Sequence, residues 1–308
     1  MNLVRRAVST ACVPVVAAWL SCGTVPPEFN ADRAFADLER QVAFGPRIPG
    51  TPAHDSCANW LIETMRGLAD TVEVQGFDGW LPQVDSAIPM RNIIARFHRA
   101  ASRRVLLGAH WDTRPYADQD PDPANHRSRF DGANDGGSGV AVLIELARAL
   151  AAAVPPVGVD LVFFDGEDVG EYGRTPGLWC QGSQHFADAL DPPNGRYRDI
   201  YRWAVIVDMV GGKDLRLVKE GISARIAPDL TERVWEIAAD LGIEVFVDAL
   251  GEDIYDDHIP LLRKGIQAID LIDMNYEYWH TIHDTPEQCA PASLAAVGRV
   301  VLQLVYSE

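Results

Sequence analysis

Short, largely apolar segments alternate with segments of helical periodicity over the second half of the chain. We expect strands at 105–108, 159–164, 204–207, 244–247 and 268–272, and helices at 136–153, 183–190, 230–241, 259–264 and 292–306. Strands without a polar face must be covered on both faces, which is typical of parallel or mixed sheets flanked by helices. The pattern therefore predicts an α/β fold with a central mixed, mostly parallel twisted sheet that helices cover on both faces.

The first half of the chain adds four elements to this pattern. They are helices at 30–42 and 56–68 and strands at 71–77 and 90–97. Neither an internal repeat nor a low-complexity tract divides the chain of 308 residues. A chain of this length can form one large α/β domain. We therefore expect a single domain over residues 29–308.

Residues 1–28 have the composition of an export signal followed by a linker. Arg5 and Arg6 precede the apolar stretch 7–20, which is too short to span a membrane and leads into a Pro-rich linker. Small residues before Cys22 favour lipoprotein processing with a lipid anchor at Cys22, but Trp19 stands where such sites usually carry Leu. Lipidation and simple cleavage both remain open. We expect an exported protein, periplasmic or on the outer surface, without a transmembrane span.

Net charge and cysteine content exclude some classes of protein. The chain carries 27 Lys and Arg against 44 Asp and Glu, a net charge of −17. Nucleic acids and anionic membranes select basic surfaces, so neither is expected as a partner. Beyond the export signal the cysteines are Cys57, Cys180 and Cys289. An odd number allows at most one disulfide, and cysteine does not organise this fold.

Acidic and histidine side chains follow the apolar segments at the point where each segment ends. In LVFFDGEDVG the apolar segment runs directly into Asp165, Glu167 and Asp168. Carboxylates this close repel one another. The carboxyl ends of parallel strands meet at one edge of a sheet, where ligands bind. We therefore expect these residues to converge there: His110, Asp135, Glu167, Asp168, Asp208 and His280.

Imidazole and carboxylate ligands without a thiolate suit Zn²⁺ ahead of Mn²⁺ or Co²⁺. A dication would also offset the repulsion between the carboxylates. Each residue alone has an ordinary explanation, because Asp135 could cap a helix, Asp208 could lie in a turn, and Asp112 could pair with Arg114. These explanations do not account for every apolar segment ending in Asp, Glu or His. The sequence therefore predicts a metal site at this edge.

The remaining histidines are less favoured as ligands. His258 and His283 rank below His280, and four others are expected to be surface or structural residues without clear partners: His54, His98, His126 and His185.

Six motifs together resemble those of the zinc aminopeptidase superfamily, and most closely its glutaminyl-peptide cyclotransferase (glutaminyl cyclase) branch. They are GAHWDTRP, GANDGGSGVAVLIELARAL, LVFFDGEDVG, IVDMVGG, DDHIPLLRKG and YWHT. The similarity extends from about Gly45 to the C-terminus. It implies a single catalytic α/β domain with zinc at the strand ends.

The resemblance implies a role for each matching residue. Asp135, Asp168 and His280 would be the ligands of one zinc ion. Glu167 would be the general acid/base, and the indole of Trp279 would line the substrate pocket. The implied reaction converts the N-terminal Gln of peptides or proteins to pyroglutamate and releases ammonia.

Further residues match positions whose role differs between branches of the superfamily. In the cyclases, Asp208 and Asp256 would belong to a proton-relay network. In the two-zinc aminopeptidases, His110 and Asp208 would hold a second ion bridged by Asp135, and Asp112 would orient His110. One zinc ion is expected for a cyclase and two for an aminopeptidase, which is the alternative function. A non-catalytic binding protein ranks lowest, because Glu167 is retained.

The chain departs from the family pattern at three places. Asp168 stands where Glu is usual, so this carboxylate reaches one methylene less far. Ala109 and Val140 occupy the positions of a disulfide found in animal cyclases, and the loop 169–179 lacks the aromatic residues of the animal pocket. These departures concern the substrate pocket more than the metal site.

Overall fold

A six-stranded sheet forms the centre of the protein, whose computed structural model describes residues 25–171, 177–191 and 200–308. Its strands, in spatial order, are β1 (Thr71–Leu81), β2 (Ser86–Phe97), β4 (Gly158–Phe164), β3 (Arg104–His110), β5 (Ala204–Asp208) and β8 (Ala268–Ile272). The β3–β4, β3–β5 and β5–β8 pairs are parallel, whereas β1–β2 and β2–β4 are antiparallel. The predicted fold class is therefore confirmed.

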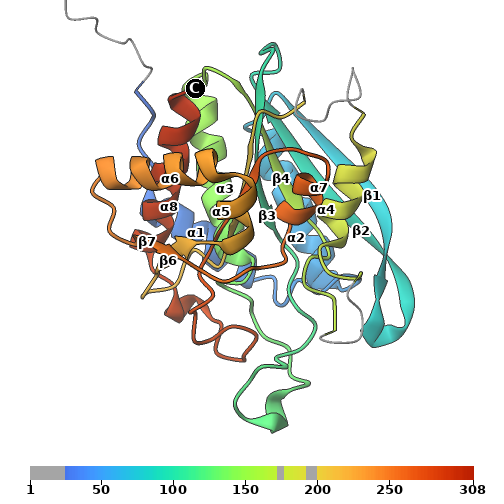
Figure 1. Cartoon of the computed structure of the whole chain (residues 1–308). Coiled ribbons are helices and arrows are strands. Elements are labelled where there is room, and N and C mark those ends of the chain that lie inside the picture. The colour runs from blue at the N-terminus through green and yellow to red at the C-terminus, as the bar shows by residue number, and fades with distance from the viewer. Residues whose placement is uncertain (1–24, 172–176, 192–199) are drawn as a thin grey trace, which may run out of the picture.

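Helices cover both faces of the sheet (Figure 1). One face carries α1 (Ala31–Val42), α2 (Pro52–Arg66), α3 (Gly137–Ala152), α6 (Pro228–Asp240) and α8 (Pro291–Tyr306), and the other carries α4 (Gln181–Ala189) and α7 (His258–Arg263). Alternate residues of one strand enter different cores, so Leu107 of β3 packs in the larger core and Leu106 in the smaller. Successive side chains point to opposite faces, and this is why wholly apolar strands need two layers of helices.

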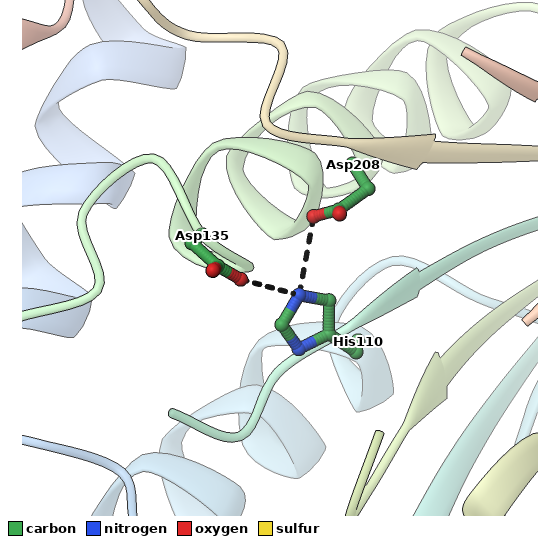
Figure 2. A group of neighbouring side chains, drawn as sticks. All are labelled: His110, Asp135 and Asp208. Atoms are coloured by element: carbon green, nitrogen blue, oxygen red, sulfur yellow. Dashed lines mark hydrogen bonds and ion pairs between the residues drawn. The ribbon is translucent and has the colours of Figure 1, made fainter. Parts of the chain in front are cut away.

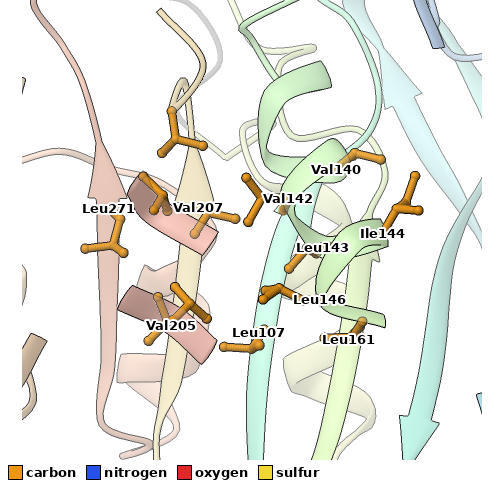
Figure 3. Close-up of a cluster of buried hydrophobic side chains, with 14 of the residues drawn as sticks. Leu107, Val140, Val142, Leu143, Ile144, Leu146, Leu161, Val205, Val207 and Leu271 are labelled. Atoms are coloured by element: carbon orange, nitrogen blue, oxygen red, sulfur yellow. The ribbon is translucent and has the colours of Figure 1, made fainter. Parts of the chain in front are cut away.

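Helix α3 packs against the middle of the sheet. Figure 3 shows Leu143 and Leu146 of α3 beside Leu107 of β3 and Leu161 of β4, all members of the larger core. The helix is buried along most of its length. Its burial holds the start of α3, and the residues just before it, close to the ends of the neighbouring strands.

The parallel strands end along one edge of the sheet. His110, the last residue of β3, is paired with Phe164, the last residue of β4. Asp208, the last residue of β5, is paired with Ile272, the last residue of β8. The residues after these strands therefore emerge side by side, at the edge where ligands bind in α/β proteins.

Two short elements were not predicted from the sequence. They are β6 (Leu217–Lys219) and α5 (Gly221–Ile226). Strand β6 pairs in parallel with β7 (Phe246–Leu250), which begins two residues later than expected, and together they form a separate two-stranded sheet. Single 3₁₀ turns occupy Pro82–Val84, Pro123–Asn125 and Pro286–Gln288. With three residues, β6 is too short to show an alternating pattern, and α5 lacks the largely apolar run by which the five-residue strands β5 and β8 were recognised.

The predicted export signal, including Cys22, lies largely outside the described residues. Within the described parts of the chain, no helix is long and apolar enough to cross a membrane. The three cysteines described there, Cys57, Cys180 and Cys289, are buried and free.

Candidate metal and catalytic site

A cavity of about 780 Å³ opens at the carboxyl ends of the strands. Seven predicted site residues line it: Asp135, Glu167, Asp168, Asp208, Asp256, Trp279 and His280. The other two, His110 and Asp112, are buried outside its lining. The volume is within the range of small-molecule sites, about 300–1,000 Å³.

Asp135, Asp168 and His280 form a compact group of potential metal ligands. One ligand atom from each residue lies within 4.8 Å of the others, and all three side chains are buried. His280 Nε2 is 3.2 Å from Asp135 Oδ2 and 3.1 Å from Asp168 Oδ2. Burial alone would lower the pKa of His280, but the two carboxylates outweigh it and raise the pKa to about 9. The group therefore attracts positive charge, whether a proton or a metal ion.

The chemistry of this group fits a zinc ion. Asp168 Oδ1 accepts a hydrogen bond from Arg114 Nη1 at 2.8 Å, while its Oδ2 is buried, faces His280 Nε2 at 3.1 Å and accepts no well-aligned hydrogen bond from the described residues. An orphaned carboxylate oxygen beside an imidazole nitrogen and a second carboxylate is a suitable donor set for Zn²⁺. Arg114 also binds Asp118 through two nitrogens. The alternative pairing of Arg114 with Asp112 is therefore wrong.

A second group of potential ligands shares Asp135 with the first. His110 Nε2 lies 3.1 Å from both Asp135 Oδ1 and Asp208 Oδ1, the two contacts drawn as dashed lines in Figure 2. The two oxygens of Asp135 thus face different imidazoles, Oδ1 toward His110 and Oδ2 toward His280. Such an arrangement suits either a bridging carboxylate between two ions or one ion beside a hydrogen-bonded imidazole.

Without a metal ion, burial and the neighbouring charges shift the pKa values of the two carboxylates in this second group in opposite directions. Burial raises the pKa of Asp208 to about 7, against the opposing effect of His110. Burial opposes ionisation of Asp135 as well, but His110 and His280 hold its pKa well below its usual range. Among the three candidate ligand carboxylates, Asp135, Asp168 and Asp208, only Asp135 has a lowered pKa, so it is the most strongly ionised of them.

Backbone contacts hold the loop that carries Asp135. The carboxylate of Asp284 accepts the N–H groups of Asn134 at 2.9 Å and Asp135 at 3.2 Å. The buried guanidinium of Arg47 donates to the carbonyls of Asp131 and Gly132 in the same loop. A Cβ atom at Gly136 would lie 2.6 Å from His110 Nε2, so only glycine fits there. Arg47 and Asp284 were not predicted as site residues, and both lie outside the six motifs that carry the resemblance.

The turn after β4 is held by Asp112. Its Oδ1 accepts the N–H of Glu167 at 3.1 Å, and its Oδ2 accepts the N–H of Asp168 at 3.3 Å. Asp112 Oδ1 is also 3.5 Å from His110 Nδ1. Gly166 takes a positive φ of 68° within the turn. One buried carboxylate therefore positions Glu167, Asp168 and His110 together.

Glu167 projects into the cavity among other acidic groups. Its Oε1 accepts a hydrogen bond from the Cys180 thiol at 3.3 Å. Burial, together with the charges of Asp256 and Asp168, raises the pKa of Glu167 well above its usual value. A carboxyl group with a raised pKa can accept and return a proton near neutral pH. Cys180 was not expected in the site, because a lone cysteine gives no signal in the sequence.

Asp165, the third carboxylate of the turn, has a partner that was not predicted. His54 Nε2 lies 2.9 Å and 3.0 Å from its two oxygens, and the N–H of Arg91 donates to Oδ2 at 2.7 Å. The ring of His54 stacks on Trp111 with centroids 4.2 Å apart. His54 is thus a buried residue with a clear partner, in contrast to the expectation that it had none. Its imidazole offsets the carboxylate that ends β4.

Trp279 and Asp256 approach the cavity from other segments. The indole of Trp279 stacks on the His280 ring with centroids 4.1 Å apart. Asp256 lies just before α7, and one of its oxygens is within 4.8 Å of ligand atoms of Glu167 and Cys180. His258, by contrast, is buried away from the cavity between Glu220 and Asp270.

Comparison with known proteins identifies relatives over most of the chain. The model of peptidase family M28 matches residues 92–305. The glutaminyl-peptide cyclotransferase of Bos taurus is 25% identical over 292 residues, covering 83% of this chain and 76% of that protein. The glutaminyl cyclase of Bacteroides thetaiotaomicron has a TM-score of 0.86 and 37% identity, covering 92% of this chain and 100% of the other. A Zn-dependent exopeptidase of Parabacteroides distasonis has a TM-score of 0.86 and 40% identity, with the same coverage.

Proposed function

Because the chain belongs to peptidase family M28, we propose that it is a zinc-dependent glutaminyl-peptide cyclotransferase acting on peptide or protein N-termini. The observation that carries this proposal is the position of Glu167. Glu167 lies in the turn after β4, one residue before the ligand candidate Asp168. Its side chain lines the cavity, where it could reach a bound substrate. Relatives that are glutaminyl cyclases support the choice of reaction.

Zinc is proposed as the cofactor, bound by Asp135, Asp168 and His280. When bound there, it would supply a Lewis acid that polarises the side-chain carbonyl of an N-terminal glutamine. The relatives include a protein described as a Zn-dependent exopeptidase, and the orphaned Oδ2 of Asp168 supports a cation at this position.

Glu167 would move the proton. Its carboxylate takes one proton from the substrate α-amine as the amine nitrogen attacks the side-chain carbonyl carbon. The bond between that carbon and the amide nitrogen then breaks, and Glu167 returns the proton to the departing nitrogen. Ammonia leaves, and the closed ring is pyroglutamate. General acid/base catalysis of this kind contributes about 10²–10⁴ in rate.

Neighbouring side chains would support this transfer. One oxygen of Asp256 lies within 4.8 Å of the Glu167 carboxylate, so Asp256 would pass a proton to Glu167 by way of a water molecule or a small shift, and Asp208 is linked to His110. Trp279 would form one wall of the substrate site, because its indole lies against His280 and lines the cavity. The cavity is large enough for a glutamine side chain and the start of a peptide.

An exopeptidase is the second candidate, and the group His110, Asp135 and Asp208 favours it. This group could hold a second ion bridged to the first by Asp135. Glu167 would then deprotonate a water molecule that attacks the peptide bond. Both reactions use the same residues at the first ion, so substrate assays must separate them.

The test uses the full chain, a Gln-initiated peptide and a chromogenic aminoacyl amide. We expect ammonia release from the peptide with a mass loss of one ammonia, little cleavage of the amide, and close to one tightly bound zinc. Chelation should abolish the activity and zinc should restore it. Two zinc ions per chain with rapid amide cleavage and no ammonia would assign the protein to the exopeptidases.

We also propose that the protein is exported, with residues 1–28 as signal and linker and Cys22 as a lipid-anchored residue. The charged start, the short apolar stretch and the small residues before Cys22 support this proposal. Labelling with a radioactive fatty acid in the native host tests it. Incorporation that is lost in Cys22→Ser is expected, and a released, unlabelled chain would favour simple cleavage.

A further inference from the structure

Two side chains on the wall of the cavity, Glu167 and Asp256, form with the buried Cys180 behind them a group separate from the two described above. Glu167, Cys180 and Asp256 each offer one ligand atom, and these atoms lie within 4.8 Å of one another. The residues come from different segments: the turn after β4, the residue before α4, and the residues before α7. The zinc proposal assigns no metal to this group.

The fold holds Cys180 against Glu167. The Cys180 N–H donates to the Glu167 carbonyl at 2.9 Å, and the next N–H, of Gln181, donates to the Gly166 carbonyl at 3.0 Å. Cys180 has a positive φ of 55° and is fully buried. Its thiol therefore has a fixed direction, toward Glu167 Oε1 at 3.3 Å.

Asp256 provides an observation independent of the cysteine. Its side chain is 3% exposed, and among the described residues its Oδ1 accepts the N–H of Asp257. Its Oδ2 is buried and accepts no N–H, hydroxyl or thiol from the described residues, and the carboxyl group of Asp270 lies beside the Asp256 carboxylate on the side of β8. A buried carboxylate oxygen without a donor is costly, and a bound cation would satisfy it.

Charge in this group also favours a cation. Two carboxylates and a thiol lie within 4.8 Å of one another, and a third carboxylate, that of Asp168, directly follows Glu167 in the chain. A dication would offset the repulsion between these carboxylates, and a thiol that coordinates it loses its proton outright.

We propose that Glu167, Cys180 and Asp256 form a further cation site, which takes a thiophilic dication such as Zn²⁺ or Cd²⁺ and inhibits the enzyme when filled. Binding forms one bond from the cation to sulfur and one to each carboxylate, and the displaced protons pass to solvent. A thiolate with two carboxylates suits Zn²⁺ and Cd²⁺, whereas Mg²⁺ and Ca²⁺ prefer oxygen alone. The inhibition, but not the binding, rests on the proposed role of Glu167.

The filled site would remove Glu167 from proton transfer. A carboxylate bound to a dication is a poor base, so excess zinc would stop the reaction while the first ion stays in place. Zinc would then have opposite effects in two concentration ranges: one equivalent would activate the enzyme as its cofactor, and excess zinc would inhibit it.

The experiment titrates Cd²⁺ into the full chain loaded with one equivalent of zinc, and records near-ultraviolet absorption from a cadmium–thiolate bond. We expect absorption that saturates near one equivalent and disappears in Cys180→Ser. Cys289→Ser is the matched control, because Cys289 is also a buried free thiol but belongs to no ligand group in the described part of the chain. It should keep the absorption.

Two further measurements make the result decisive. Asp256→Asn keeps the thiol but loses a charged ligand. Mutation of a residue that only supports a ligand costs about 10–100-fold in metal affinity, so the cadmium affinity of Asp256→Asn should fall by at least that factor. Inhibition by excess zinc should need a correspondingly higher concentration in Cys180→Ser, and Mg²⁺ should not inhibit.

Some results would overturn the proposal. Undiminished absorption in Cys180→Ser, or zinc inhibition that disappears in His110→Ala but persists in Cys180→Ser, would place the ion elsewhere. The absorption does not depend on turnover. A protein that binds Cd²⁺ at Cys180 but releases no ammonia would refute the proposed reaction and leave the cation site standing.

Discussion

Arg114→Met should weaken zinc binding without removing any ligand. The guanidinium of Arg114 donates to Asp168 Oδ1 at 2.8 Å and to the Asp168 carbonyl at 3.2 Å. It is held by two bonds to Asp118 and is 3% exposed. Methionine fills similar space but donates nothing, so Asp168 would be free to turn both oxygens away from the His280 side.

The size of the effect follows from the bond that is lost. A hydrogen bond to a charged group is worth about 1.5–3 kcal/mol. If the whole contribution orients Asp168 for the ion, zinc affinity falls by about 10–150-fold, since about 1.4 kcal/mol is tenfold. Breaking a buried ion pair also destabilises the fold by about 3–5 kcal/mol. Thermal unfolding should therefore shift as well.

Competition with a chromophoric chelator measures the affinity on folded protein at low temperature. Arg114→Lys keeps the positive charge but not the planar set of guanidinium donors. Its zinc affinity should therefore lie between those of the wild type and Arg114→Met. Arg66→Met is the matched control, because Arg66 forms an exposed ion pair with Glu63 and should leave zinc affinity unchanged. Wild-type zinc affinity in folded Arg114→Met would refute the idea that Arg114 orients Asp168.

The other predictions concern single residues of the site and one outside it. Glu167→Gln should keep zinc while kcat falls by about 10²-fold or more, and loss of zinc would make Glu167 a ligand. Asp168→Ala should lose both zinc and activity, and full turnover with stoichiometric zinc would remove this residue from the site. His110→Ala should keep one zinc and lose about 10–100-fold in activity, whereas loss of a metal equivalent would make His110 a direct ligand. For Glu220, burial would raise the pKa, but His258 and its other hydrogen-bond donors lower it from 4.5 to about 2. The wild type should therefore lose on the order of 3 kcal/mol of unfolding free energy as pH falls from about 4.5 toward 2, and acid unfolding of Glu220→Gln should lack this slope.

The strands and the location of the site could be predicted from the sequence, because both depend on local patterns. A segment such as LVFF is apolar on both faces, and only a sheet covered twice can bury it. Parallel strands then bring their carboxyl ends to one edge, so Asp135, Asp168 and His280 were expected to meet. The sequence also carried the similarity to the family through residues that lie close to these strand ends.

The pairing of charges inside the site was decided only by the tertiary structure. Arg114 lies two residues from Asp112 in sequence, yet it binds Asp168, and His54 binds Asp165 across the fold. Such pairs join segments whose separation along the chain carries no record of their distance in space. Cys180 reaches Glu167 in the same way, through the packing of α4 against the turn after β4. Periodicity reports which face of an element is buried, but the partner of a buried polar group depends on how distant elements pack together.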